Sequence, residues 1–192
     1  MRRLKTAGAL ALVAGLLLCS TALAKEKSEP DVYSAIWAVV GGTAGGSTVS
    51  INIYVNRYNT DDDIMNYAAL LVDSGPDGLR GALEKEDLGQ LAPVGRVGTP
   101  IAIARKLQKG DKTIVRVVTV RNLSFVELRY SGRSVDYPYT FLELVLDKNG
   151  KGTGTAIGAA KIRFNKKKNT YEIESYQHGT AYNKLLNVQL MK

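Results

Sequence analysis

The stretch TPIAIARKLQKGDKTIVRVVTVR, residues 99–121, contains two runs of β-forming residues on either side of a short connection at residues 109–111. In each run, side chains at odd and at even positions would point to opposite faces of a strand, as in strands that bury one face. With a two-residue loop, odd positions of the first run share a face with even positions of the second. These positions are Ile101, Ile103, Arg105 and Leu107 in the first run, and Ile114, Arg116, Val118 and Val120 in the second.

Arg105 and Arg116 therefore fall on the more aliphatic face of this hairpin. An unpaired guanidinium is costly to bury, so each arginine needs an acidic partner, an exit to the sheet rim or an anionic ligand. We hypothesise that both arginines line a cavity and hold a carboxylate or phosphate head group. The alternatives are a partly solvated face, pairing with Glu127, Glu143 or another acid, or a three-residue loop that breaks the parity.

Further strand-like segments lie on both sides of the hairpin, and turn residues separate most of them. They cover residues 33–40, 49–56, 140–147, 153–164, 170–176 and 185–190. The segment VSINIYVN, 49–56, alternates strictly between apolar and polar side chains, as a half-buried strand does. In the segment around Gly158 the apolar phase slips, which indicates a bulge or a sharp corner of the sheet.

The apolar spacing changes to a helical period at Thr60, which is placed to cap a helix whose first turn is acidic. A second helical pattern has Pro76 near its start and Gly89 as its stop. Together they predict a short helical pair between about residues 60 and 90. The predicted fold class is mainly β (α+β), an antiparallel barrel or two-sheet sandwich of about eight strands, with this helical pair inserted after the second strand.

The glycine-rich stretch GGTAGGST, residues 41–48, has the composition of a phosphate-binding loop. A P-loop also needs a lysine after its last glycine and a helix whose N-terminal amides face the phosphate. Here Ser47 and Thr48 lead directly into an alternating strand. The glycines therefore indicate a hairpin or bulge rather than a nucleotide site.

Residues 1–24 have the pattern of a signal peptide, with basic residues, an apolar run and a final Ala-Leu-Ala. We expect cleavage after Ala24, a flexible lead-in over 25–31, and a single β-rich domain over 32–192. Cleavage would remove Cys19, the only cysteine. The expected location is secreted or periplasmic, with no membrane-spanning segment in the mature chain and no nucleic-acid partner.

Few residues offer catalytic chemistry. His178 is the only histidine of the chain, and the mature chain is expected to have no thiol, so we assign no catalytic residue, metal ligand or cofactor. The loop SGRSVDYPY, 131–139, gathers Arg133, Tyr137 and Tyr139 before a strand, where binding sites often lie. We include these three residues among the candidate ligand-binding residues. The alternative is a rigid turn whose tyrosines cap the core.

The order of the elements resembles the fatty-acid-binding type of calycin barrel, which places two helices early as a lid over its cavity. The sequences PVGRVG, 93–98, and SGRSVDYPY also resemble a group of exported bacterial proteins, a likeness that implies export and no particular activity. We expect an exported, non-catalytic binding module for a small amphipathic or anionic ligand. The alternatives are an envelope structural or interaction protein without a ligand, and a hydrolase that uses the 131–139 loop.

Overall fold

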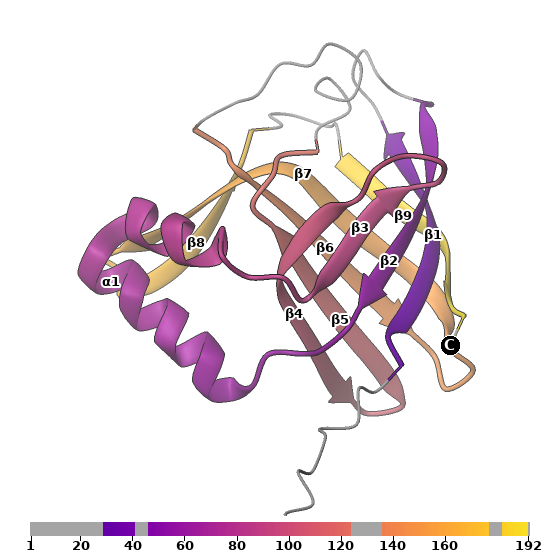
Figure 1. The fold of residues 1–192 in the computed structure, drawn as a ribbon, viewed down its shortest axis with the longest axis horizontal. Coiled ribbons are helices and arrows are strands. Elements are labelled where there is room, and N and C mark those ends of the chain that lie inside the picture. The colour runs from indigo at the N-terminus through magenta and orange to yellow at the C-terminus, as the bar shows by residue number, and fades with distance from the viewer. Residues whose placement is uncertain (1–28, 41–45, 124–135, 177–181, 192) are drawn as a thin grey trace, which may run out of the picture.

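The computed structural model describes residues 29–40, 46–123, 136–176 and 182–191 (Figure 1). These residues form nine strands and one helix. The strands are β1 (Asp31–Val40), β2 (Thr48–Val55), β3 (Gly89–Pro93), β4 (Thr99–Lys109), β5 (Lys112–Thr119), β6 (Tyr139–Leu146), β7 (Lys151–Asn165), β8 (Thr170–Ser175) and β9 (Tyr182–Leu190), and the helix is α1 (Asp61–Leu83).

Eight of these strands close into an antiparallel barrel. The neighbours follow the order β1, β2, β3, β4, β5, β6, β7 and β9, and β9 pairs back with β1. In the described part of the chain, β8 pairs only with the outer half of β7. The mainly β, antiparallel prediction is therefore confirmed, and of the two architectures left open the barrel is the one formed.

Hydrophobic side chains fill the interior of the barrel. Every one of its eight strands contributes to one continuous cluster, whose fully buried members include Tyr33, Ile53, Leu91, Leu144 and Leu185. Each such side chain contributes about 1.5–3 kcal/mol by leaving water. The interior is thus occupied by the protein's own side chains, unlike the ligand cavity that the calycin resemblance implies.

The segment between β2 and α1 completes the barrel wall beside β4. Strand β3 is short, and it pairs with β4 only near the start of that strand. Further along, the Asn59 amide N–H donates to the Ala104 carbonyl at 2.8 Å, and the Ala104 amide N–H donates to Asn59 Oδ1 at 2.9 Å. Asn59 is buried, so these bonds replace the strand partner that β4 lacks. They also fix the point at which α1 begins.

A single helix follows β2, so the prediction of a helical pair was wrong. Thr60 caps α1 with a complete capping box, in which the Asp63 side chain accepts from the Thr60 backbone N–H. The helix continues through Gly75, the only residue inside it with non-helical dihedral angles, φ 72° and ψ −172°. Pro76 follows immediately, where its missing N–H costs little because the kink has already broken the hydrogen-bond ladder. The Gly-Pro pair therefore kinks one helix instead of separating two.

A second hydrophobic cluster lies outside the barrel, between α1 and the outer face of β4–β7. Its buried members are Leu71, Leu79 and Leu83 of α1 together with Ala102, Val118, Tyr139 and Ala160 of the strands. Strand β7 shifts register beside Gly158 and then leaves the barrel to form a hairpin with β8, so the predicted irregularity is present. Figure 1 shows α1 to one side of the barrel with β8 behind it.

Candidate functional site

The outer face of β4–β7 carries one row of polar side chains across the strands. The register places Arg105 opposite Arg116, Arg116 opposite Glu143, and Glu143 opposite Thr155. We call these four residues the polar row. The turn between β4 and β5 is the two-residue loop Gly110–Asp111, so the two arginines share a face as the parity argument required.

Apolar rows border the polar row on both sides. On the side of α1, Ile103, Val118, Phe141 and Ile157 are cross-strand neighbours. On the opposite side the neighbours are Leu107, Ile114 and Val145. Cross-strand neighbours on one face lie about 4.5–5.5 Å apart at Cβ, so each row is a continuous surface. The outer face is therefore amphipathic, with a charged band between two apolar bands.

Ile64 of α1 and Ile173 of β8 complete a groove of about 660 Å³ over this face. Apart from the polar row its lining is apolar. Small-molecule sites usually have about this volume, about 300–1,000 Å³, and a mostly hydrophobic wall with a few polar groups. The groove lies between the barrel, α1 and the β7–β8 hairpin, outside the barrel.

Arg105 is held by the segment that starts α1. Its Nη1 donates to the carbonyl of Asn59 at 3.2 Å, and its Nη2 donates to the carboxylate of Asp61. The Arg105 side chain is only 19% exposed, whereas that of Asp61 is 84% exposed. Arg105 therefore ties β4 to the first residue of α1 and has its Nη groups engaged with the protein.

Arg116 is more accessible than Arg105. Its Nε donates to Glu143 Oε2 at 2.7 Å, and the two side chains are 55% and 40% exposed. Pairing with Glu143 is the acid partnership that the sequence analysis left open, while Glu127 lies outside the described residues. The charge of Arg116 is thus compensated by a neighbour that is itself in contact with water.

The 131–139 loop does not join the groove in the part that the structure describes. Arg133 lies outside the described residues. The Tyr137 hydroxyl donates to Glu174 Oε1 at 3.0 Å, and its ring packs edge-on against Tyr176. Tyr139 is buried in the outer hydrophobic cluster, and burial raises the pKa of its hydroxyl to about 12. Neither tyrosine lines the groove, and their role in ligand binding stays a prediction.

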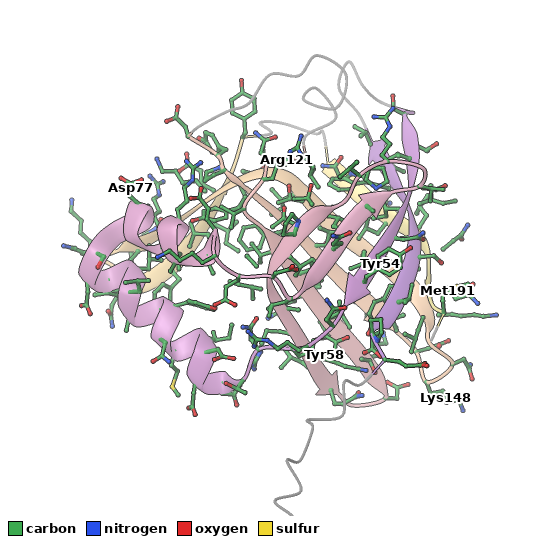
Figure 2. The ribbon with its side chains drawn as sticks, viewed as in Figure 1. Tyr54, Tyr58, Asp77, Arg121, Lys148 and Met191 are labelled. Atoms are coloured by element: carbon green, nitrogen blue, oxygen red, sulfur yellow. The ribbon has the colours of Figure 1, made fainter. Side chains whose placement is uncertain are left out.

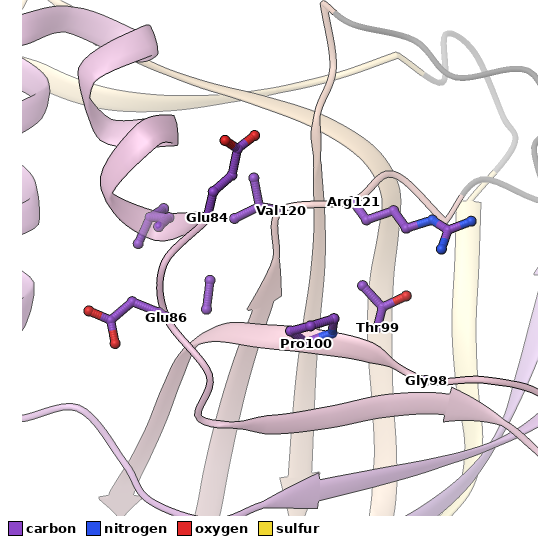
Figure 3. A pocket seen from close by; sticks show the side chains of 9 residues that line it. Glu84, Glu86, Gly98, Thr99, Pro100, Val120 and Arg121 are labelled. Carbon is purple, nitrogen blue, oxygen red and sulfur yellow. The ribbon is translucent and has the colours of Figure 1, made fainter.

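A smaller pocket of about 240 Å³ lies where α1 ends, with Glu84 and Glu86 on its wall. Figure 3 shows both carboxylates on one side of it and the Arg121 guanidinium extending away from them. Glu86 accepts from Tyr67 and from Arg57. These carboxylates hold the helix end in place, and among the described residues no three metal-ligating side chains gather to bind an ion.

A third polar cluster lies at the end of the barrel where β1 begins. The Asp31 carboxylate accepts from the Tyr58 hydroxyl at 2.6 Å, from Lys106 Nζ at 2.9 Å and from the Tyr33 hydroxyl at 3.3 Å. Figure 2 shows Tyr58 in the same lower part of the view as the turn that carries Lys148. Both this cluster and that turn border a pocket of about 400 Å³.

The ionisation of this cluster is shifted by burial and by its hydrogen bonds. Burial raises the pKa of Asp31, but the hydrogen bonds from Tyr58 and Lys106 and the charge of Lys106 outweigh it and lower the pKa overall. Burial raises the pKa of Tyr33 to about 12. Burial and the hydrogen bond to Asp31 raise the pKa of Tyr58 still further. The cluster is thus a negatively charged carboxylate held by two neutral phenols and one lysine.

Of the residues that line the groove, only Arg105 and Arg116 were predicted from the sequence. Thr155 and the apolar residues Ile64, Phe141 and Ile173 come from four separate elements. The alternation of 140–147 carried a usable signal, because its odd positions share a face. That signal could not be used without knowing that this strand lies beside β5.

Comparison of the chain with models of protein families finds no match. The same holds for comparison with curated proteins and with solved structures. The likeness of PVGRVG and SGRSVDYPY to exported bacterial proteins therefore yields no family assignment. No helix in the described part of the chain is both long and apolar enough to cross a membrane.

Proposed function

We propose that this protein is a non-catalytic binding protein, secreted or periplasmic, for a small amphipathic ligand with a polar or anionic head. The groove on the outer face of β4–β7 is the observation that carries this proposal. Its apolar rows fit a hydrocarbon segment, and its polar row fits a head group. Each Å² of apolar ligand surface removed from water there contributes about 25 cal/mol.

The polar row is suited to binding rather than to catalysis. It offers two guanidinium groups, one carboxylate and one hydroxyl, and both arginines are paired with acids. Nucleophilic catalysis needs a hydroxyl or thiol within hydrogen-bond reach of a base. Among the groove's hydrogen bonds, that of Glu143 runs to Arg116, which favours charge recognition over activation of Thr155.

One observation favours a second candidate, an envelope structural or interaction protein without a ligand. The barrel interior is filled with side chains, as expected if the barrel serves only as a scaffold. In that case the groove between α1, β8 and the barrel is simply a region where surface elements pack loosely. The two candidates differ in whether the isolated protein binds an amphiphile in the groove.

The test is isothermal titration calorimetry of the mature chain with decanoate and with decan-1-ol. Thr155 lines the groove and is exposed, so Thr155→Trp should fill it without disturbing the barrel interior. Thr153 is also exposed and lies two residues earlier on the same face of β7, outside the groove lining. Thr153→Trp is therefore the matched control.

We expect wild type and Thr153→Trp to bind both probes, and Thr155→Trp to bind them at least about tenfold more weakly. Circular dichroism of the three proteins checks that they share one fold. The proposal fails if wild type binds neither probe. It also fails if Thr155→Trp binds as tightly as Thr153→Trp does.

A further inference from the structure

The two arginines of the polar row are not equivalent, and this difference bears on which head group the groove accepts. The inference rests on the proposed function, because it concerns the same groove. Arg105 is mostly buried and contacts both Asn59 and Asp61. Moving it toward a ligand would leave the backbone carbonyl of the buried residue Asn59 without that donor, at a cost of about 1–3 kcal/mol. Arg105 therefore belongs to the frame that holds α1.

Arg116 can change partner at much lower cost. In the described part of the chain the only hydrogen bond of its side chain runs from Nε to Glu143. A guanidinium has five N–H donors, so one such bond leaves the Nη groups for another acceptor. Both members of the pair are about half exposed, and exposed pairs contribute only about 0–1 kcal/mol. Another acceptor can therefore replace Glu143 as the partner of Arg116, and the Glu143 carboxylate is then solvated by water.

The present partner of Arg116, Glu143, indicates which class of ligand head group Arg116 accepts. The present partner of Arg116 is a carboxylate. A ligand carboxylate can therefore take its place with the same geometry, which matches the planar guanidinium. Among the described residues that line or border the groove, the two arginines are matched by Glu143 and Asp61, so there is no surplus of positive charge. A dianionic phosphate would meet two carboxylates with a larger repulsion than a monoanion would.

We infer that Arg116 binds the carboxylate of an amphipathic monocarboxylate, and that Glu143 is a built-in competitor that this carboxylate displaces. The apolar row on the side of α1 binds the hydrocarbon chain. Thr155 offers a hydroxyl one strand beyond Glu143. Glu143 thereby sets the affinity for carboxylate ligands, because each of them must first displace it. Ligands without a negative charge bind in the same groove without displacing Glu143.

The experiment compares Glu143→Gln and Arg116→Gln with wild type by calorimetry, with decanoate, decan-1-ol and decyl phosphate as probes. Glu143→Gln keeps the shape of the side chain and removes its charge. It should tighten decanoate binding about threefold to tenfold and leave decan-1-ol within about twofold. Arg116→Gln should weaken decanoate binding about tenfold and also leave decan-1-ol within about twofold. In the double variant, the effect of Glu143→Gln should disappear.

Two results would overturn the inference while leaving the proposed function intact. One is equal weakening of decanoate and decan-1-ol by Arg116→Gln. The other is decanoate binding that Glu143→Gln leaves unchanged or weakens. Tighter binding of decyl phosphate than of decanoate by wild type would overturn the carboxylate assignment. If wild type binds no probe at all, the proposed function itself fails, and the inference falls with it.

Discussion

Replacing each arginine of the polar row by glutamine should affect stability very differently. Arg105→Gln and Arg116→Gln make the same chemical change on the same face of adjacent strands, at positions directly opposite each other. Both remove one positive charge, so effects of net charge are matched. We expect Arg105→Gln to destabilise the fold clearly and Arg116→Gln to have little effect.

The expected magnitudes come from the contacts of each guanidinium. Arg105→Gln removes a hydrogen bond to the carbonyl of Asn59, whose residue is buried, and a charged hydrogen bond to Asp61. Asp61 is well solvated, so most of the loss comes from the carbonyl, and we expect about 1–3 kcal/mol. Arg116→Gln removes one exposed ion pair, for which about 0–1 kcal/mol is expected.

Urea unfolding of the chain from Lys25 onward measures both values. Trp37 is 4% exposed within the barrel core, so its fluorescence reports the loss of the whole barrel. We expect a lower urea midpoint for Arg105→Gln at an unchanged slope, and a midpoint near that of wild type for Arg116→Gln. Equal losses, or a larger loss for Arg116→Gln, would refute the division into a framework arginine and an exchangeable one.

Asp31→Asn should lower stability at neutral pH, by an amount that shrinks in acid. The pKa of Asp31 in the folded protein lies below its ordinary value of 3.8, so its carboxylate contributes fully to stability above pH 3.8 and loses this contribution as the pH falls through the folded pKa. Urea unfolding of both proteins from pH 7 to pH 2 checks this. A stability difference that does not change with pH would contradict it. Tyr139→Phe should leave stability unchanged or raise it by up to about 1 kcal/mol, because within the described residues the buried Tyr139 hydroxyl has no partner; a lower thermal midpoint would show that it has one. If residues 1–24 are removed as a signal peptide, the processed chain should begin at Lys25, which mass spectrometry of the intact chain would show; a lipid-bearing N-terminus at Cys19 would contradict cleavage after Ala24.

The local part of the fold could be predicted because it depends on neighbours in sequence. The alternation in 99–121 and the Gly110–Asp111 turn determine a hairpin, and the register of Arg105 with Arg116 follows from them. The alternation of odd and even positions did not predict one detail. A register shift between Ile101 and Ile103 turns Ile101 into the barrel interior while Ile103 stays on the outer face. Bulges of this kind depend on sheet curvature, which alternation does not encode.

Which face of the hairpin points into the barrel could not be predicted from alternation. From the sequence we expected the arginine-bearing face to line a cavity, because it is the more aliphatic face. In the fold the opposite face, with Ala104, Val115 and Val117, fills the barrel. Closure of the barrel depends on pairing of β6 with β7 and of β9 with β1, between segments far apart in sequence. The groove exists only because α1 and β8 then pack outside.

The central claim is that an amphiphile binds on the outer face of β4–β7, and amide chemical shifts measured during titration with decanoate test it most directly. Saturable shifts should concentrate at the polar row and at Val118, Phe141 and Ile157, and should be smaller at Trp37 and Leu144 in the interior. Shifts that saturate in the barrel interior, or at the Asp31 end of the barrel instead of the groove, would contradict the account.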